Sequence, residues 1–445
     1  MAVGKGAGLA SLRSKVNAAY GGKVAQAAHQ QKFAHPRLST GSLPLDHAVG
    51  VEPDGSAGVP TGLITMFVGG KSSGKTTTAL RVLAAAQRCC ARCWRPAKNV
   101  TMVPEMEEDK DGALQPALDD QGEVVYTLTG QCDCYAIHAW EPVHPKEYPD
   151  NFDTKKAAAL YDEVLAHLKL NSYEPVGAAY FDVENALDRA WAKRFGVMLE
   201  VLEIIVPGSG EEGIDVCTEY IKSGLIDFYV MDSLAQLTPR VEIEASSEDQ
   251  QRAAQAKLIN KAVRVWVSTS AHVQSHFHKS VTAIWIQQER MGMGQGAGKV
   301  KPGGKGQEFA EAIEVEFFKS DVEEVPDPAY KGLNKSDIPM RSSRCRVNYV
   351  IKKNKTFPTE KMKGSFRVAM MDGDGIQAGD ILEEEVVNKL ALALGIVEKN
   401  GSKYTYEGKS YSTQSEVFDE VFGTPEAAAR NRVEILKRIA GFKVA

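Results

Sequence analysis

The stretch GGKSSGKTTTAL at residues 69–80 fits the pattern G-x-x-x-x-G-K-[ST], with Lys75 at the lysine position. The residues before it, GLITMFVG, are apolar and partly β-branched, which predicts a buried strand. The residues after Lys75, TTTALRVLAAAQR, repeat apolar positions at helical spacing. A strand, a glycine-rich turn and a helix in this order are the context of a phosphate-binding loop, so the stretch predicts a bound nucleoside triphosphate.

The chemistry of this loop assigns expected roles to its residues. Main-chain N–H groups of the turn and the N-terminus of the following helix would bind phosphate oxygens. Lys75 would reach the terminal phosphates, and the Thr76 hydroxyl would ligate Mg²⁺. The residues expected to line the nucleotide are Gly69, Gly70, Lys71, Ser72, Ser73, Gly74, Lys75, Thr76 and Thr77. The alternative is a chance glycine-rich turn, against which both flanking segments argue.

Composition bounds the class of protein. The chain has 445 residues, enough for two or three domains, and 43% hydrophobic with 25% charged residues is typical of a soluble globular protein. The net charge of −5 does not indicate a nucleic-acid binder, so local charge must decide. We find no signal peptide and no membrane-spanning run, which predicts a cytoplasmic protein. In that reducing compartment the seven cysteines favour metal binding over disulfides.

The order of patterns suggests how the chain is divided. Residues 1–38 form a basic arm, in which an amphipathic helix at 8–20 must bury its apolar face on its own core or on a neighbouring subunit. Residues 39–376 alternate strands and helices, which predicts an α/β core with a mostly parallel sheet covered on both faces. Residues 88–176 read as an insertion in this core, with a helix near 154–170. Residues 377–445 predict a small C-terminal domain of short helices and a hairpin.

Two carboxylates lie at the ends of predicted strands. Asp232 ends the apolar run FYVMD, where a carboxylate beside a phosphate-binding loop would be the second Mg²⁺ anchor. Glu184 follows another strand, in YFDVEN, where it could orient or deprotonate an attacking water. The alternative for Glu184 is a place beside a helix N-cap.

The motifs together resemble the bacterial RecA recombinases. STGSLPLD, GGKSSGKTT, YFDVENALD, YVMDSLAQLTPRVEIE, IQQERM and KKNK occur in the order and approximate spacing of that family, over nearly the whole chain apart from the insertion. The resemblance implies a RecA-like P-loop ATPase core with a small α+β C-terminal domain. It also implies a DNA-dependent ATPase that converts ATP to ADP and phosphate. A phage origin is one expectation for so divergent a member.

The resemblance further implies roles for individual residues. Glu184 would activate the hydrolytic water, while Thr76 and Asp232 would hold Mg²⁺. The other family positions are Asp188 and Trp191 for adenine, Gln288 as the sensor of the γ-phosphate, and Lys353 and Lys355 for the ATP of the neighbouring subunit. The alternative for the lysine pair is a solvated strand edge.

DNA binding requires a cationic path along the phosphates. The glycine- and lysine-rich loop at 290–307 offers such a path, and the helix near 250–268 carries further family positions. The candidates are Arg290, Met291, Lys299, Lys301 and Lys305 in the loop, and Arg252, Lys257 and Arg264 on the helix. The loop has no aromatic residue before Phe309, which resembles the family's interface phenylalanine, so stacking by the loop is not expected. The alternative for the helix is ordinary exposed charge.

Four cysteines of the insertion have the spacing of a zinc site. Cys90 and Cys93 form one close pair, and Cys132 and Cys134 form another. Two such pairs suit tetrahedral thiolate coordination of Zn²⁺, which would close a module too polar to build its own core. Cys89 or His138 could replace one ligand, and free thiols are the alternative. The insertion itself could recruit a replication or repair protein or contact duplex DNA.

These observations lead to one main expectation and two rivals. The expected protein uses ATP and Mg²⁺, polymerises with itself on single-stranded DNA and exchanges that strand with homologous double-stranded DNA. One rival is a branch-migration or helicase-type motor with the same core. The other is an ATP-binding, DNA-coating scaffold without strand exchange, which the altered DNA loops keep open.

Overall fold

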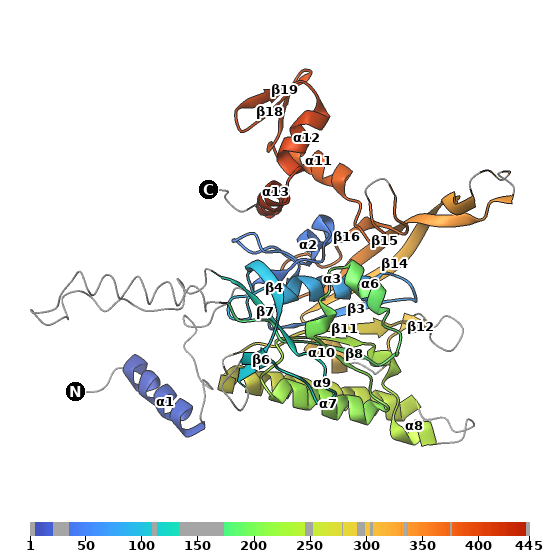
Figure 1. The fold of residues 1–445 in the computed structure, drawn as a ribbon. Coiled ribbons are helices and arrows are strands. Elements are labelled where there is room, and N and C mark those ends of the chain that lie inside the picture. The colour runs from blue at the N-terminus through green and yellow to red at the C-terminus, as the bar shows by residue number, and fades with distance from the viewer. Residues whose placement is uncertain are drawn as a thin grey trace, which may run out of the picture.

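The structure is a computed structural model. It describes residues 5–20, 35–108, 114–132, 173–244, 252–277, 279–291, 299–302, 306–330, 332, 334, 337–373 and 376–441. An eight-stranded sheet forms its centre, in the order β16-β15-β14-β3-β11-β10-β8-β9 (Figure 1). The strands are β3 (Ile64–Gly69), β8 (Ala178–Asp182), β9 (Leu202–Ile205), β10 (Phe228–Asp232), β11 (Thr282–Gln288), β14 (Ile313–Pro326), β15 (Met340–Asn354) and β16 (Lys363–Ala369).

Pairing within this sheet is mostly parallel. Each pair of neighbours is parallel along the series β14, β3, β11, β10, β8 and β9. The two remaining pairs, β14–β15 and β15–β16, are antiparallel. The predicted α/β class with a mostly parallel sheet is therefore confirmed.

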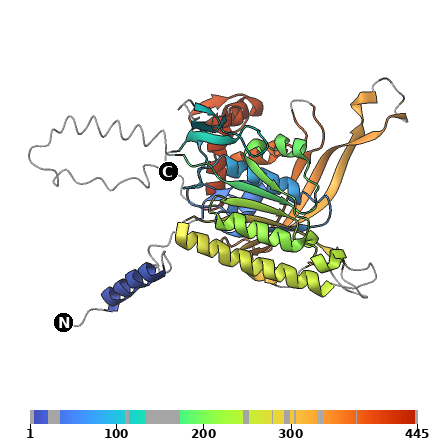
Figure 2. The same ribbon diagram turned by 60° about the horizontal axis from the view of Figure 1, so that its bottom comes forward.

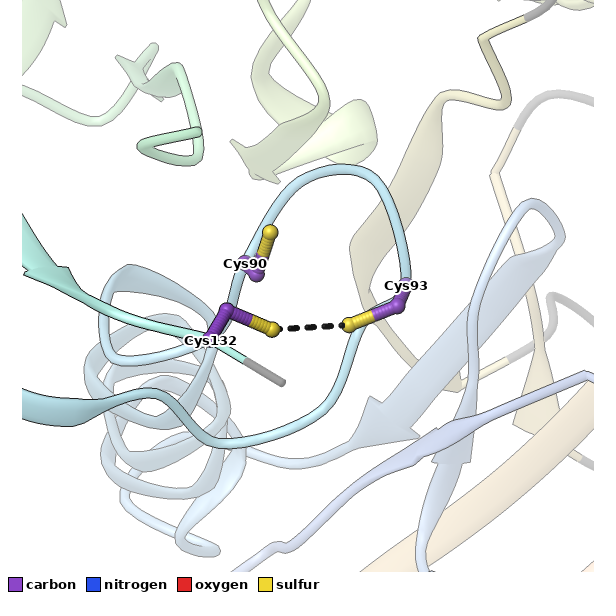
Figure 3. A group of neighbouring side chains, drawn as sticks. All are labelled: Cys90, Cys93 and Cys132. Carbon is purple, nitrogen blue, oxygen red and sulfur yellow. Dashed lines mark hydrogen bonds between the residues drawn. The ribbon is translucent and has the colours of Figure 1, made fainter. Parts of the chain in front are cut away.

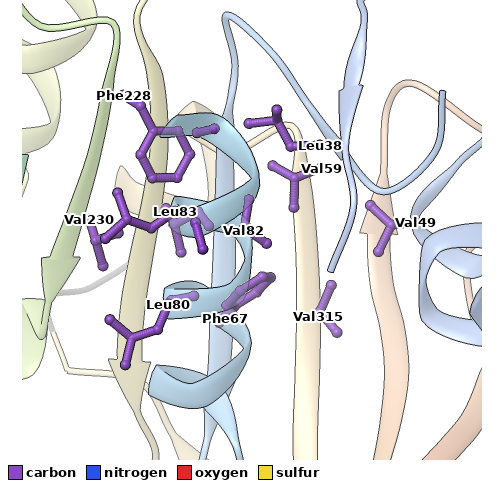
Figure 4. Close-up of a cluster of buried hydrophobic side chains, with 14 of the residues drawn as sticks. Leu38, Val49, Val59, Phe67, Leu80, Val82, Leu83, Phe228, Val230 and Val315 are labelled. Atoms are coloured by element: carbon purple, nitrogen blue, oxygen red, sulfur yellow. The ribbon is translucent and has the colours of Figure 1, made fainter. Parts of the chain in front are cut away.

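Helices cover the sheet on both faces because its inner strands are apolar on both sides. Phe67 of β3 points to one face, where it packs with Leu80 and Leu83 of α3 (Lys75–Gln87) (Figure 4). Its neighbours Met66 and Val68 point to the other face and join the cluster that contains Trp266. That face is covered by α7 (Gly210–Lys222) and α9 (Arg252–Phe277), which lie side by side in Figures 1 and 2.

The turn between β3 and α3 has the conformation that its glycines predict. Gly74 is in the left-handed region at φ 95° and immediately precedes the first residue of α3. Gly69 has φ 153°, and a Cβ atom there would lie 2.4 Å from the main-chain oxygen of Phe317 on β14. The chain can therefore curl between β3 and α3 only with glycine at these positions, and the strand–turn–helix expected from the sequence is present.

A long hairpin of β14 and β15 extends beyond the body of the molecule (Figures 1 and 2). The alternating apolar residues of RCRVNYVIKKNK predict the second strand, β15, whereas the sequence has no such pattern along the whole of β14. The outer half of β14, SDVEEVP, carries charged and solvent-exposed residues such as Glu323 and Glu324 and so lacks an apolar core pattern. Pairing with β15, rather than burial, holds this half in the strand conformation.

The segments flanking the core contain the elements that were expected, although the domain boundaries at 38 and 377 stay predictions. The N-terminal helix is α1 (Lys5–Tyr20), and Leu12 on it is 57% exposed in the single chain. The C-terminal elements are α11 (Glu384–Ala393), β17 (Glu398–Asn400), β18 (Lys403–Tyr406), β19 (Lys409–Tyr411), α12 (Gln414–Phe422) and α13 (Pro425–Ile439). They share an apolar cluster to which Leu43 of α2 (Leu43–Val49) also belongs.

The region expected to be an insertion contains two small antiparallel sheets. β4 (Lys98–Pro104) pairs with β7 (Tyr126–Gln131), and β5 (Met106–Glu108) pairs with β6 (Leu114–Pro116). The helix predicted at 154–170 lies outside the described residues. Among the helices that the structure describes, we find none with the length and apolarity needed to cross a membrane.

A buried ion pair joins the core to the C-terminal elements. Asp46 of α2 is 1% exposed, and Arg432 of α13 lies 3.4 Å from its carboxylate while also bonding to Glu383. Burial raises the pKa of Asp46, and the guanidinium of Arg432 opposes that rise. The charge on Asp46 is therefore tolerated because Arg432 is present.

Replacing Arg432 with alanine is expected to lower the free energy of unfolding by about 3 kcal/mol, because it leaves a buried carboxylate without its counter-ion. Urea-induced unfolding, followed by circular dichroism, measures the change. Lys389→Ala is the control, since its ion pair with Glu385 is solvent-exposed and contributes at most about 0.5 kcal/mol. Equal, small losses in both variants would contradict this account of the junction.

Candidate active site

The side chain of Lys75 is hydrogen-bonded to the main chain of the loop that follows β3. The Nζ atom of Lys75 donates to the main-chain oxygens of Gly69, at 3.0 Å, and Gly70, at 2.6 Å. Burial lowers the pKa of Lys75, while Asp232, Glu184 and Glu289 raise it. The ammonium group therefore lies inside the loop, where three carboxylates favour its charged form, which suits a group that is to bind phosphates.

Asp232, at the end of β10, is joined to α3 and β8 through one carboxylate oxygen. Thr76 Oγ1 donates to Asp232 Oδ2 at 2.8 Å, and the Tyr180 hydroxyl donates to the same atom at 2.7 Å. Burial raises the pKa of Asp232 to about 6, and the hydrogen bonds from Tyr180 and Thr76 oppose the rise. A hydroxyl and a carboxylate side by side are hard oxygen ligands of the kind that Mg²⁺ prefers, so these residues fit the expected ion.

Sequence analysis missed Tyr180. It is a lone tyrosine in the buried strand β8, and a buried tyrosine hydroxyl needs a hydrogen-bond partner. That requirement was the available signal, but only the parallel pairing of β8 with β10 shows that the partner is Asp232.

Glu184 is fixed by two donors from neighbouring strands. Ser233 Oγ donates to Glu184 Oε1 at 2.6 Å, and Gln288 Nε2 donates to the same oxygen. Ser233 directly follows β10, across a cis peptide bond, and Gln288 ends β11. The structure thus brings the expected base and the expected γ-phosphate sensor into direct contact, and it adds Ser233, to which the sequence had given no role.

The two residues expected at adenine lie at the start of α6 (Arg189–Arg194). Asp188 is the N-cap of this helix, and its Oδ1 accepts a hydrogen bond from the Trp191 main-chain N–H at 3.0 Å. The Trp191 ring is half-buried and packs edge-on against Phe195, with 5.1 Å between ring centroids. The helix N-cap in this part of the chain is thus Asp188, four residues after Glu184, and a role of Asp188 or Trp191 at adenine stays a prediction.

Lys353 and Lys355 contact the short helix α10 (Gly306–Ala310), which follows the lysine-rich loop. Lys353 Nζ donates to the main-chain oxygen of Glu308, and Lys355 Nζ donates to that of Phe309 at 3.1 Å. Phe309 itself is 79% exposed. An exposed phenylalanine beside two lysines is typical of a surface that another subunit covers.

The candidate DNA-binding residues fall in three groups. Lys257 and Arg264 are exposed on α9, and exposed Lys261 lies between them on the same side of the helix. The sequence analysis missed Lys261, although its helical spacing from Lys257 and Arg264 could have shown it. Lys301 forms an ion pair with Glu314 at 2.6 Å and is 20% exposed. The positions outside the described side chains are Arg252, Arg290, Met291, Lys299 and Lys305; the backbone of Arg290–Met291 pairs with that of Lys299–Val300.

The cysteines of the insertion converge. The Sγ atoms of Cys90, Cys93 and Cys132 lie within 4.8 Å of one another, with 3.4 Å between those of Cys93 and Cys132 (Figure 3). A hydrogen bond with Cys90, together with burial, raises the pKa of the Cys93 thiol. Three thiols at this spacing fit a tetrahedral Zn²⁺ site, for which Cys134 and His138 lie outside the described residues. Cys89 instead packs in the core cluster on the α3 side of the sheet and donates to Ala85.

This thiol cluster lies where the insertion joins the core. Cys90 comes a few residues after α3, and its backbone bridges to Pro175, where the chain returns to the sheet. Glu174 forms ion pairs with Arg92, at 2.9 Å, and with Lys279, at 2.8 Å. A metal at the cluster would therefore join Cys132 to the start of the insertion, just after the helix that follows the phosphate-binding loop, where the backbone bridge to Pro175 also holds the far end.

Comparison with models of known protein families shows to which family the chain belongs. The model of the RecA N-terminal domain matches residues 9–95 and 163–361, which is more than half of the chain. The chain belongs to the RecA family. The gap in the match, between 95 and 163, falls inside the segment predicted as an insertion into the RecA core.

Curated relatives extend the RecA likeness. Protein RecA of Desulforapulum autotrophicum is 26% identical over 422 residues, covering 94% of this chain and 87% of the relative. Protein RecA of Nitratidesulfovibrio vulgaris is 28% identical over 407 residues, covering 89% and 80%. Protein RecA of Lactobacillus delbrueckii is 34% identical over 235 residues, covering 52% and 62%.

Replacing Tyr180 with phenylalanine is expected to raise the Mg²⁺ concentration needed for nucleotide binding about tenfold. The variant keeps the packed ring but removes a hydrogen bond that stabilises the charged form of Asp232, and such bonds contribute about 1.5–3 kcal/mol. Titration of a fluorescent ATP analogue with Mg²⁺ measures the effect. Tyr220→Phe, which loses a comparable bond to exposed Glu203, is the control. Identical Mg²⁺ dependence in wild type and Tyr180→Phe would show that this oxygen of Asp232 does not serve the metal.

Replacing Cys132 with serine is expected to reduce bound zinc from about one ion per chain to a small fraction and to lower the thermal unfolding temperature, because zinc binding energy is also folding energy. Atomic absorption and differential scanning fluorimetry measure the two quantities. Cys217→Ser removes a buried thiol that packs between α7 and the sheet, away from the cluster, and should leave the zinc content unchanged. Zinc-free wild type, or equal zinc in both variants, would refute the assignment.

Proposed function

We propose that this chain is an ATP-dependent homologous recombination protein that forms filaments on single-stranded DNA and exchanges that strand with homologous duplex. The observation that supports this proposal most is the connection from Glu184, through Gln288, to the lysine-rich loop. Glu184, the expected base, accepts a hydrogen bond from Gln288, and the strand that ends at Gln288 leads directly into the lysine-rich loop at 290–307. A change at the nucleotide would thus reach a candidate DNA-binding segment within a few residues.

In ATP hydrolysis the residues of the proposed site would have separate roles. Lys75 and the loop N–H groups would bind the phosphates, and Thr76 with Asp232 would hold Mg²⁺, which would neutralise phosphate charge. Glu184, held by Ser233 and Gln288, would orient and deprotonate the attacking water. Because Gln288 and Ser233 share one carboxylate oxygen, the other oxygen remains for the water.

Assembly would complete the site. We propose that Lys353 and Lys355 leave the carbonyl groups of α10 and reach the ATP of a neighbouring subunit, where cations offset the charge of phosphoryl transfer. Exposed Phe309, beside them, would pack into that neighbour. Hydrolysis would then depend on filament formation, and loss of the γ-phosphate would release the contact.

DNA would bind along cations from two elements. Lys257, Lys261 and Arg264 form an exposed stripe on α9, and the loop at 290–307 adds further lysines. We propose that these residues follow the phosphates of the single strand, consistent with binding that weakens as salt rises. The insertion, fastened by zinc, would project to a replication or repair partner in the cytoplasm.

Glu184→Gln is expected to keep nucleotide binding and DNA-dependent assembly while lowering the rate of ATP hydrolysis by about a hundredfold or more, because only the base is removed. Phosphate release with and without single-stranded DNA measures the rate, and sedimentation measures assembly. Glu203→Gln, an exposed glutamate on β9, is the matched control. Lys75→Ala should instead lose nucleotide binding. Normal hydrolysis by Glu184→Gln would remove Glu184 from the mechanism.

Strand exchange with homologous and heterologous duplexes separates the proposal from its rivals. A recombinase uses only the homologous duplex. Filaments that bind ATP and DNA without exchanging strands would indicate a scaffold, and directional unwinding of a forked substrate would indicate a motor.

A further inference from the structure

A charged recess lies beside the two lysines on the proposed subunit face. It has a volume of about 490 Å³ and lies between α10 and the ends of β14 and β15 nearest to α10. Its lining residues are Lys301, Glu308, Phe309, Glu311, Glu314, Lys352, Lys353 and Lys355. Four lysines and three glutamates therefore surround one recess.

Glu311 is the unusual member of this group. Its side chain is completely buried, and no nitrogen or hydroxyl donor of the residues that the structure describes bonds to its carboxylate oxygens, although the carboxyl group of Glu314 is close enough to share a proton with it. The nearest cation is Lys353, whose Nζ lies 3.9 Å from Glu311 Oε1. A buried carboxyl group that lacks a nitrogen or hydroxyl donor destabilises the folded state, so its presence calls for an explanation.

The surroundings of Glu311 keep it uncharged near neutral pH. Burial, together with the neighbouring carboxylate of Glu314, raises the pKa of Glu311 to about 8. Lys301 neutralises Glu314 at 2.6 Å, and Lys352 pairs with Glu316 at 2.9 Å. The remaining charges at the recess are those of Glu308 on α10 and of Lys353 and Lys355 from β15 and its end, so a second negative charge on the glutamate pair would act mainly on Lys353.

We propose that Glu311 is a positioning residue for Lys353. As a neutral group it supports the lysine at the subunit face without binding it tightly, so that Lys353 is free to reach a triphosphate held by the next subunit. As a carboxylate it draws the ammonium group inward and competes with that triphosphate. This inference rests on the proposed function, because it specifies how the intersubunit contact of Lys353 is adjusted.

The glutamate pair, Glu311 and Glu314, also connects the lysine-rich loop to Lys353. Lys301 lies in a described part of the lysine-rich loop and pairs with Glu314, which in turn neighbours Glu311. When Lys301 contacts DNA phosphate, Glu314 loses its cation, and the glutamate pair then retains its shared proton more strongly. Neutral Glu311 is thereby favoured, and Lys353 remains available for the neighbouring nucleotide.

The test compares pH profiles of ATP hydrolysis in the presence of saturating single-stranded DNA. The wild-type rate is expected to fall about tenfold between pH 7 and pH 9, since an acid with a pKa of about 8 is about nine-tenths ionised one unit above it. Glu311→Gln keeps the shape but cannot ionise, so its rate should change less than about threefold over the same range. Glu311→Asp keeps a titratable group and should retain a decline.

The control is Glu323→Gln, on the same strand pair. Glu323 is half-exposed and faces Arg344 at 3.8 Å, so its replacement removes one paired glutamate without touching the recess. Its pH profile should follow that of wild type. ATP-dependent sedimentation with DNA at pH 7 and pH 9 supplies a second readout, in which Glu311→Gln should keep at pH 9 the assembly that wild type loses.

The outcomes separate the two proposals. A Glu311→Gln profile that coincides with wild type, or declines at lower pH, overturns the role of Glu311 while leaving DNA-dependent hydrolysis established. Wild-type hydrolysis that does not respond to DNA at any pH overturns the proposed function and this inference together.

Discussion

The parallel pairing of β3, β11, β10 and β8 is the constraint on which the rest of the structure depends. Parallel strands end at the same edge of a sheet, so Gly69, Gln288, Asp232 and Asp182 come to that edge from four separate parts of the chain. Each strand is buried on both faces, which excludes water and strengthens the interactions of the polar groups that follow the strands. The proposed nucleotide site is a consequence of this edge rather than of any single segment.

The site is organised around shared oxygen atoms. One oxygen of Asp232 accepts from Thr76 and Tyr180, and one oxygen of Glu184 accepts from Ser233 and Gln288. Each carboxylate is therefore oriented by two donors from other segments of the chain. Such orientation is the condition for a fixed metal ligand or a fixed base, because a freely rotating carboxylate would lose most of its directional effect.

The proposed subunit face differs from this site, because its charges are only partly balanced. Glu311 is buried with no nitrogen or hydroxyl donor on its carboxylate among the described residues, and the ammonium groups of Lys353 and Lys355 donate to main-chain carbonyl groups of α10. In a monomer such groups are costly, but at an interface they can change partners when a charged ligand arrives. The exposed ring of Phe309 beside them fits the same interpretation.

The sequence by itself determined the local elements: the phosphate-binding turn, the apolar strands, the helices between them and the cysteine pairs, because each is encoded within a few consecutive residues. Only the tertiary structure decided which distant residues meet. It joined Tyr180 to Asp232, gave the capping role to Asp188, paired Lys301 with Glu314 and buried Glu311. It also revealed β14, whose outer half is held by pairing with β15 and so leaves no apolar pattern in the sequence. Hydrogen bonds and ion pairs between remote segments depend on sheet register and helix packing, and no local pattern records them.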